Sequence, residues 1–346
     1  MNLVDDNEVY SQRCPNDNLL LQAVLNSHRK FYGENATYRR ILRDCKADPK
    51  TLSELPFLHI RNFKLFSFAS SNFSRSVISS ATSGKSSTFI IDDIGLNERN
   101  ISTKAIGKKF LGDDNSSLVI LNDRKQLFKN AVPASLMAAL SLKYLAKKQI
   151  FALNNGLDVD SFKYETINRL CSNDNSIIIH GLTWQLLEIC NNKKIAEILK
   201  NLFMHKRLKF STSGGWKNNE AIALTYNRLN ELLKITFDLK SNLFDFYGMT
   251  EHPGIIYPLC KMGYRHVPTW SKVLIRDIKS KRVIFNKEGQ IQLLSGLPQG
   301  YPGHSILTED IGIAFEKQCE CGLAGDIFQF KRRLHKAESR GCGTLH

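Results

Sequence analysis

The sequence predicts an α/β fold: a parallel sheet covered by helices, followed by a smaller β-rich portion. Between residues 118 and 247, short apolar segments alternate with longer segments whose apolar residues recur at helical spacing. The segments at 118–121 and 177–179 are continuously apolar, as expected for parallel strands buried on both faces. Strands that alternate with helices favour a parallel sheet.

The expected elements follow in chain order. Residues 18–44 repeat apolar side chains at helical spacing and predict a helical N-terminal region. Strands are then expected at 118–121, 177–179, 207–211 and 243–247, and helices at 131–145, 184–203 and 220–237. After Glu251, short antiparallel strands are expected at 273–276, 290–294 and 327–330. The predicted parts are a helical region at 1–60, an α/β nucleotide- and acyl-binding core at 61–255, and a β-rich closing portion with a tail at 256–346.

Composition narrows the class of protein. The chain has 346 residues, of which 42% are hydrophobic, enough for a sizeable core. No apolar stretch is long enough to cross a membrane and the N-terminus is acidic and polar, so a cytoplasmic protein is expected. The net charge of +15 is scattered without a nucleic-acid-binding motif, so no nucleic-acid partner is expected. Eight cysteines without a signal peptide indicate reduced thiols.

A small hydroxyl- and glycine-rich loop at residues 79–87 is the most informative stretch. Its hydroxyls, backbone N–H groups and one ammonium suit a nucleotide phosphate. Gly84-Lys85-Ser86 reads like the end of a Walker A loop, but Ser79 stands where that motif needs a glycine. The loop therefore predicts a phosphate site of another kind.

Later segments after expected strands offer places for the rest of a nucleotide. Gly214 and Gly215, next to Trp216, let a planar base approach bare backbone. The stretch 245–251 combines an aromatic ring, a glycine and a Thr-Glu pair that can bind a metal or phosphate oxygens. Asp310, in a loop expected at 307–312, has a carboxylate that could accept both ribose hydroxyls. Loops at the carboxyl ends of strands are where α/β folds bind such ligands.

In this order the motifs resemble the adenylate-forming superfamily, and within it the acyl-protein synthetases of the LuxE type, which are related to phenylacetate-CoA ligases. The likeness is carried further by the segments 214–217, 264–268, 307–312, 319–322 and 333–342. The resemblance implies the superfamily's large N-terminal domain, here without the full C-terminal small domain and so without a candidate for its catalytic lysine. The chain departs from the superfamily pattern at Ala81 and Ser86 of the loop.

What the resemblance implies is two-step activation of a carboxylic, fatty or other acyl acid: ATP and Mg²⁺ give an acyl-adenylate, and a thiol then takes the acyl group. Its implied catalytic residues are Lys85, Thr250, Glu251 and Cys342, with Glu251 holding the Mg²⁺. The implied nucleotide-binding residues are Ser80, Thr82, Ser83, Gly84, Ser86, Gly214, Gly215, Tyr247, Gly248 and Asp310. Two other functions stay open: an acyltransferase that uses pre-activated acyl groups, and a non-catalytic nucleotide-binding subunit of a biosynthetic complex.

The thiol that receives the acyl group has two candidates. Cys342 is preceded by Arg333, Lys336 and Arg340, basic neighbours that would favour its thiolate. Otherwise the acceptor is external: coenzyme A, an acyl carrier protein or a reductase subunit. An acidic carrier would suit the positive net charge.

Two further groups of residues are candidate sites. Cys260, His266, Cys319 and Cys321 could hold a structural zinc ion, or the Cys-x-Cys pair could merely form a tight turn. His180 follows an expected strand and could line the acyl pocket. Trp184 and Trp216 could be pocket walls or ordinary packing.

Overall fold

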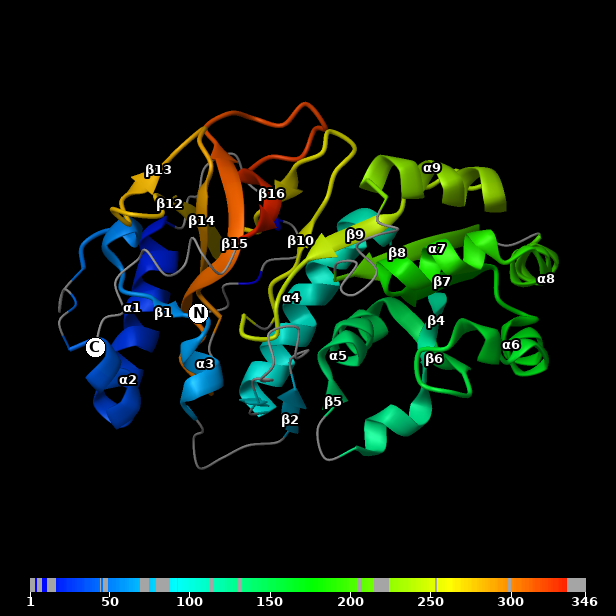
Figure 1. The fold of residues 1–346 in the computed structure, drawn as a ribbon, viewed down its shortest axis with the longest axis horizontal. Helices are drawn as coiled ribbons and strands as arrows, with labels where there is room; N and C mark the ends of the chain where they lie inside the picture. The colour runs from blue at the N-terminus through cyan, green and yellow to red at the C-terminus, as the bar shows by residue number, and fades with distance from the viewer. Residues whose placement is uncertain are drawn as a thin grey trace.

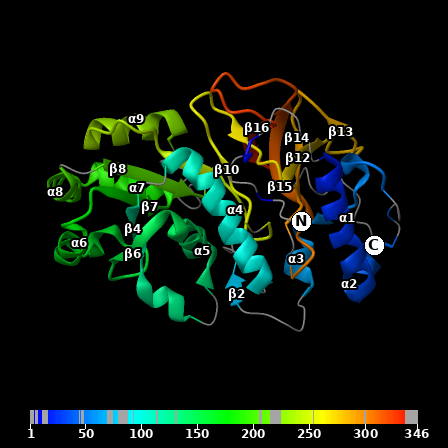
Figure 2. The same cartoon turned by 180° about the vertical axis from the view of Figure 1, so that it is seen from behind.

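The computed structural model describes residues 4, 8–10, 17–43, 45, 49–68, 75–78, 88–91, 93–112, 115–129, 132–204, 207–214, 224–252, 254–297 and 300–334. Two large sheets stand on either side of the central helix α4 (Asp93–Leu111), and Figures 1 and 2 show this arrangement from opposite sides. None of the described helices is both long and apolar enough to cross a membrane.

The first large sheet is the predicted parallel sheet. Its order is β10-β9-β8-β7-β4-β6; the strands from β6 to β9 pair in parallel, and β10 is antiparallel to β9. The strands are β4 (Ser116–Asp123), β6 (Ala146–Leu153), β7 (Ser176–Gly181), β8 (Arg207–Ser213), β9 (Phe244–Tyr247) and β10 (Tyr257–Pro258). Strands β4 and β7 are buried along their whole length, which confirms that their continuously apolar segments are covered on both faces.

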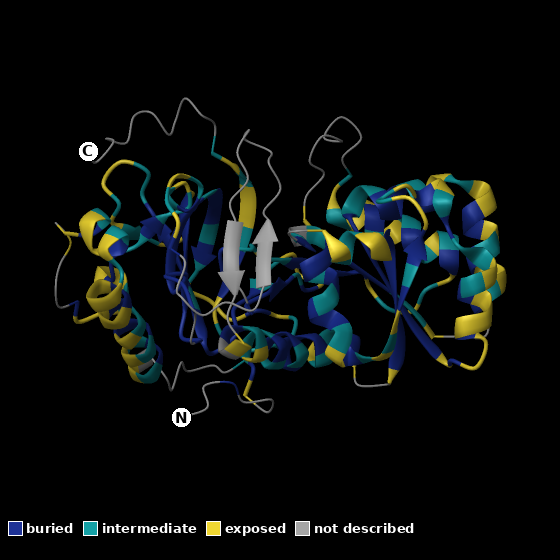
Figure 3. Cartoon of the chain, turned by 90° about the horizontal axis from the view of Figure 1, so that it is seen from below, coloured by how far each residue is buried: buried dark blue, intermediate teal, exposed yellow. Residues whose placement is uncertain are grey.

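Alternate residues of these strands face different helices. Val119 and Ile179 belong to the core that includes α6 (Tyr164–Cys171), α7 (Thr183–Asn191), α8 (Lys193–Phe203) and α9 (Tyr226–Phe237). Leu118 and Ile178 belong to the other core, with α4 and α5 (Ala134–Ser141). Figure 3 shows the strands buried and the outer faces of the helices exposed. The two-residue period of a strand thus joins both helical layers to one sheet.

The second large sheet is antiparallel, in the order β11-β16-β15-β14-β12-β13, with β1 pairing in parallel with β15. Its strands are β1 (Leu58–His59), β11 (Arg265–His266), β12 (Ser271–Arg276), β13 (Val283–Ile284), β14 (Gly289–Ser295), β15 (Ser305–Phe315) and β16 (Ile327–Arg333). The expected strands after Glu251 are therefore confirmed. Leu274 and Leu294 pack against α1 (Asp17–Glu34), which with α2 (Ala36–Ile41) forms the N-terminal helical region.

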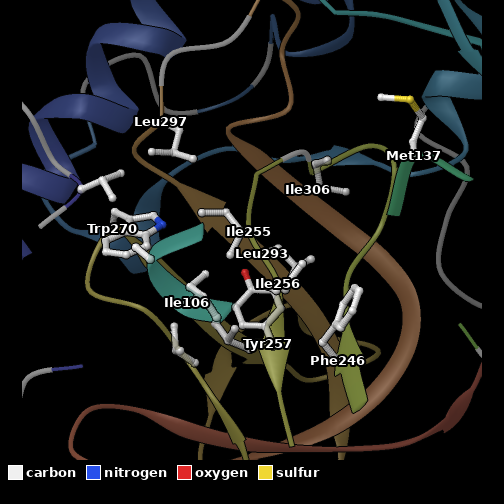
Figure 4. Close-up of a cluster of buried hydrophobic side chains, with 14 of the residues drawn as sticks. Ile106, Met137, Phe246, Ile255, Ile256, Tyr257, Trp270, Leu293, Leu297 and Ile306 are labelled. Atoms are coloured by element: carbon white, nitrogen blue, oxygen red, sulfur yellow. The ribbon is translucent and has the colours of Figure 1, made fainter. Parts of the chain in front are cut away.

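Helix α4 joins the sheets through a shared core. Its Ile106 lies in the apolar cluster of Figure 4 with Trp270, Tyr257 and Leu293. The indole Nε1 of Trp270 donates a hydrogen bond of 2.8 Å to Ser102 of α4. A small third sheet, β3-β2-β5, lies beside this core and consists of β2 (Arg75–Ile78), β3 (Thr88–Ile91) and β5 (Val132–Pro133). The division into parts at residues 60 and 255 stays a prediction.

Several expectations differ from the structure. The helix expected at 131–145 is instead strand β5, helix α5 and a short 3₁₀ helix over Leu142–Leu145. The helix expected at 184–203 is two helices, because Asn192 ends α7 and its side chain accepts the backbone N–H of Ile195 to begin α8. The loop expected at 307–312 is the interior of β15. Helix α4 has no clear apolar periodicity and was not predicted, since it buries polar side chains such as Ser102 and Thr103 beside its apolar ones.

Candidate functional site between the two large sheets

Strand β9 of the parallel sheet meets β15 of the antiparallel sheet through one hydrogen bond. Tyr247, the last residue of β9, donates its hydroxyl to Oδ2 of Asp310 at 2.7 Å. The Tyr247 ring is stacked with the Phe330 ring at 5.9 Å, and the Arg265 guanidinium lies over it, also at 5.9 Å. Burial, and then the neighbouring Asp310, raise the pKa of Tyr247, so it stays a hydrogen-bond donor. The aromatic residue and the aspartate singled out in the sequence therefore belong to one site.

Asp310 projects from a bulge in β15 and not from a loop. Gln290 and Gln292 are two residues apart on β14, whereas their partners on β15, Ile311 and Leu307, are four residues apart. The hydroxyl of Thr308 holds this irregularity: it donates to the carbonyl of Ile291 at 2.9 Å and accepts the N–H of Asp310 at 3.1 Å. Bulges of this kind redirect side chains next to active sites.

The Asp310 carboxyl is 5% exposed and lies beside Arg333, whose Nε is 3.4 Å from Oδ1. Burial raises the pKa of Asp310 even though the Arg333 charge and the Tyr247 hydroxyl favour the ionised form. A buried carboxylate with both oxygens in polar contact can accept hydrogen bonds from a sugar diol.

Glu251 lies in the turn that follows β9 and is 5% exposed. Burial raises the pKa of Glu251 to about 7, although its own backbone N–H and the charge of Lys64 oppose the shift. The preceding residue, Thr250, has its carbonyl held by the Tyr301 hydroxyl at 3.1 Å. At Gly254, where φ is +85°, a Cβ would lie 2.8 Å from the Cα of Arg99, so only glycine lets this turn approach α4 so closely. The turn therefore holds a buried carboxylate close to Asp310.

A second polar group surrounds His180 at the carboxyl end of β7. Its Nδ1 is 3.1 Å from the Ser211 hydroxyl and its Nε2 is 3.4 Å from that of Ser213. Burial lowers the pKa of His180 to about 3, so the imidazole is neutral at physiological pH. The ring is stacked on Phe246, one residue before Tyr247, at 6.0 Å.

His180 lines a small cavity of about 10 Å³. The other lining residues come from β4, the loop after β6, the end of β7, α5 and the start of α7. They are Ile120, Leu121, Asn122, Ser135, Ala139, Leu157, Gly181, Leu182 and Gln185. Trp184 is half-buried on α7 and is not one of them. Sequence reasoning missed Asn122 and Gln185; their place at or just after the carboxyl ends of apolar strands is the signal that could have found them.

The Cys260, His266, Cys319 and Cys321 side chains form one cluster, with ligand atoms all within 4.8 Å of one another. The sulfurs of Cys260 and Cys319 are 3.6 Å apart, and that of Cys321 is 3.3 Å from Nε2 of His266. Gly263 and Gly322 have φ of +78° and +94°, and each donates its N–H to the carbonyl three residues earlier, closing a tight turn after a cysteine. The four residues that the sequence suggested as zinc ligands therefore also lie together in the structure.

Several predicted site residues lie outside the described residues: the 79–87 loop with Lys85, the Gly215-Trp216 pair, and Cys342. The strands that flank the loop are described, and β2 pairs with β3 so that Ile78 lies opposite Thr88. Gly214 ends the described part of its segment with φ of +81°, and its carbonyl accepts the Thr183 hydroxyl at 2.8 Å.

Comparison with known proteins identifies the family. A family model described as acyl-protein synthetase, LuxE, matches residues 8–345. A long-chain-fatty-acid–luciferin-component ligase of Aliivibrio fischeri is 25% identical over 328 residues, covering 90% of this chain and 83% of that protein.

Solved structures share the fold. A 2-hydroxyisobutyryl-CoA ligase in complex with 2-HIB-AMP and CoA matches with a TM-score of 0.68 and 11% identity, covering 95% of this chain and 71% of that one. An anthranilate-CoA ligase in complex with anthranoyl-AMP matches with a TM-score of 0.50 and 12% identity, covering 75% and 47%. These likenesses confirm the predicted adenylate-forming fold. The chain belongs to the LuxE family of acyl-protein synthetases, acid–thiol ligases that use ATP to form an acyl-adenylate and then pass the acyl group to a thiol.

Proposed function

We propose that this chain activates a long-chain fatty acid at the site formed by Tyr247, Glu251 and Asp310. The observation that carries the proposal is the Tyr247–Asp310 hydrogen bond with Glu251 buried nearby, because it unites a ring, a diol acceptor and a metal-binding carboxylate. The choice of acid rests on the name of the Aliivibrio fischeri relative.

In this proposal Asp310 accepts the two ribose hydroxyls, and Tyr247, with Gly248 after it, lies against the nucleoside. The Asp310 oxygens fit this role because each already has a polar neighbour, Tyr247 or Arg333, that fixes its direction. Gly214 and Gly215 would leave room for the adenine face, since a side chain at either position would occupy that space.

The phosphates would lie toward Glu251. Its carboxylate would hold Mg²⁺, a hard cation that prefers oxygen ligands, and the Thr250 hydroxyl would contact phosphate oxygens. Ser80, Thr82, Ser83, Gly84, Lys85 and Ser86 would supply further donors. When bound, the metal offsets charge that accumulates on the phosphates as the acid attacks.

The acyl chain would enter near His180. The His180 imidazole is neutral, so an apolar chain would meet no charge there, and the cavity of about 10 Å³ beside it marks the place where the chain would begin. Trp184 and Trp216 are the proposed walls further out. We assign the thiol step to Cys342, with coenzyme A, an acidic acyl carrier protein or a reductase subunit as the external acceptor.

The Cys–His cluster is proposed to bind a structural zinc ion. Tetrahedral zinc with Zn–S bonds of about 2.3 Å places its sulfur ligands about 3.8 Å apart. The 3.6 Å between Cys260 and Cys319 is close to that value, and three sulfurs with one imidazole form an ordinary zinc ligand set. Metal analysis of purified protein should find one zinc ion per chain. Cys319→Ser should lose it and unfold at lower temperature, whereas Cys190→Ser, outside the cluster, should keep it.

Exchange of labelled pyrophosphate into ATP tests the adenylation step. Exchange that requires a long-chain acid and not a short one is expected. No acid-dependent exchange with a broad panel of acids would contradict adenylation. Cys342→Ala should keep the exchange and lose the acyl label that is bound through a thioester; a variant that is still labelled would remove Cys342 from the mechanism.

A further inference from the structure

Arg99 lies on the face of α4 that packs against the segment after Glu251. The hydroxyl of Ser102, one turn further along α4, donates a hydrogen bond to the carbonyl of Gly254. A Cβ at Gly254 would lie 2.8 Å from the Cα of Arg99 and 3.2 Å from its Cβ. The backbone of Arg99 is therefore fixed against the chain just after the turn that holds the Glu251 carboxyl.

The Arg99 guanidinium reaches from α4 to the neighbouring helix α5. Its Nη2 donates a hydrogen bond of 3.3 Å to the carbonyl of Met137. On α5, Met137 lies between Ser135 and Ala139, both of which line the small cavity at His180. The guanidinium is thus bonded to a helix that forms one wall of the proposed acyl site.

The start of α5 also lies near the predicted phosphate loop. Strand β5 pairs in parallel with β2, and Pro133 lies opposite Ile78, the last described residue before that loop. Ala134 begins α5 directly after Pro133. The first turn of α5, which contains Met137, therefore lies on the side of the small sheet from which the loop leaves.

One nitrogen of Arg99 has no partner. The residue is partly buried, and its Nη1 is a buried atom that no hydrogen-bond acceptor reaches in the described part of the chain. Among the described residues, no carboxylate forms an ion pair with Arg99. Burial lowers the pKa of Arg99, because the interior disfavours its charge. An anion bound beside the guanidinium would offset that cost.

The buried Arg276 shows how this fold satisfies a guanidinium that only supports structure. Its Nε donates to the side chain of Gln292, its Nη1 to the carbonyl of Lys281 and its Nη2 to the carbonyl of Ser53, at 2.5 to 2.8 Å. All three nitrogens of Arg276 thus bond neutral oxygens. The described residues bond Arg99 through Nη2 alone, so its Nη1 stays ready to donate to a ligand oxygen.

The proposed reaction indicates which anion would bind there. A carboxylate that attacks the α-phosphate must lie between the phosphates, proposed at the Glu251 turn, and the acyl chain, proposed at His180. Arg99 contacts the segment after that turn with its backbone and α5 with its side chain. A guanidinium binds a carboxylate strongly and in a fixed direction.

We propose that Arg99 binds the carboxylate of the acid substrate and orients it for attack on the α-phosphate of ATP. The proposal rests on the proposed function of the site. It adds a residue of α4 that recognises the head group of the acid, whereas the residues near His180 would contact the chain.

Binding of an acid and of its neutral analogue tests the role of Arg99. Hexadecanoate and hexadecanol share one chain and differ in the head group, and equilibrium dialysis measures the affinity of each. Arg99→Gln should weaken binding of hexadecanoate about tenfold to a hundredfold, the range for losing hydrogen bonds between charged groups. Binding of hexadecanol should change by less than about twofold. Arg99→Lys should restore part of the lost affinity, since it keeps the charge but not the fork of donors.

Lys109→Ala is the matched control, because it removes an exposed cation from the same helix. It should bind both ligands like the wild type. Equal weakening of hexadecanoate and hexadecanol by Arg99→Gln, or no weakening of either, would overturn the proposal. A higher KM for ATP with an unchanged KM for the acid in the exchange assay would also overturn it, because Arg99 would then bind the nucleotide.

Arg99→Met provides a second variant if the glutamine variant unfolds. It removes a charge that is only partly paired, so it should unfold at no lower temperature than the wild type and still bind hexadecanoate more weakly. Absence of acid-dependent exchange in the wild type would instead contradict adenylation, because the dialysis experiments involve no chemistry.

Discussion

The two large sheets contribute to the site in different ways. The parallel sheet places its residues where strands end: Tyr247 closes β9, Glu251 lies in the turn after it, and His180 lies at the end of β7. The antiparallel sheet supplies Asp310 from the interior of β15, where side-chain hydrogen bonds hold a bulge. Topology alone thus positions one half of the site, whereas the other half depends on a local irregularity.

The largest effect is expected at the parallel sheet. Glu251→Gln should slow acid-dependent ATP–pyrophosphate exchange about a hundredfold to a thousandfold, as when one preorganised electrostatic group is lost from a reaction centre. Glu188→Gln on α7 is the control, since burial also raises the pKa of that carboxyl but its charged neighbours are Asp160 and Asp158 and not Asp310. Comparable rates for the two variants would remove Glu251 from the chemistry.

The same substitution should stabilise the protein at high pH. The pKa of Glu251 is raised from 4.5 to about 7 by burial, so the folded chain binds this proton more tightly than the unfolded chain. The carboxyl therefore costs stability as pH rises from 4.5 to 7, reaching about 3 kcal/mol above that window. Glu251→Gln should unfold at a higher temperature than the wild type at pH 8, with a smaller difference at pH 5. A lower unfolding temperature at pH 8 would contradict the buried carboxylate.

An intermediate effect is expected at the antiparallel sheet. Asp310→Ala should raise the KM for ATP about tenfold to a hundredfold, because hydrogen bonds to a charged group are lost. The loss should also appear in adenosine binding, since the ribose is common to both. Asp326→Ala is the control, because this aspartate of the same half of the molecule forms an ion pair with Lys272 and is 47% exposed. If the two variants have the same KM for ATP, Asp310 does not bind the nucleotide.

The smallest effect tests the bulge itself. Thr308→Val keeps the shape of the side chain but removes the hydroxyl that joins Ile291 to Asp310, and the KM for ATP should rise about threefold. Thr269→Val, which removes a hydroxyl bonded to the carbonyl of Glu8, should leave the KM unchanged. The KM of both variants is measured by kinetic titration with ATP. If Thr308→Val has the same KM as Thr269→Val, the bulge in β15 does not position Asp310.

The same difference between the sheets explains what the sequence could predict. Continuous apolar segments predicted β4 and β7, and residues at strand ends predicted His180, Tyr247 and Glu251 as neighbours of a ligand. The stretch Thr308-Glu309-Asp310 was expected to be a loop because α/β folds hold nucleotides in loops at the carboxyl ends of strands. It is a strand because Thr308 and Asp310 are buried and bonded to distant partners.

Charged contacts between distant segments were also beyond sequence reasoning. The pairing of Arg61 with Glu309 depends on the register of β1 against β15, which joins residues far apart in the chain. The Cys–His cluster is different, because soft ligands of known chemistry can be grouped from composition and spacing without knowing the register.

Strand β11 is only two residues long, yet it is shared by two groups of side chains. His266 faces Cys321, whereas the adjacent Arg265 bonds Asp245 at 3.2 Å and lies over the Tyr247 ring. Neighbouring residues of a strand point to opposite faces, so one peptide unit separates the sulfur ligands from the aromatic ring. Because so little separates the two groups, a double-mutant cycle between Cys319 and Tyr247 is expected to be non-additive. Single substitutions in the cluster are therefore expected to change the affinity of the proposed nucleotide site without any contact with the nucleotide.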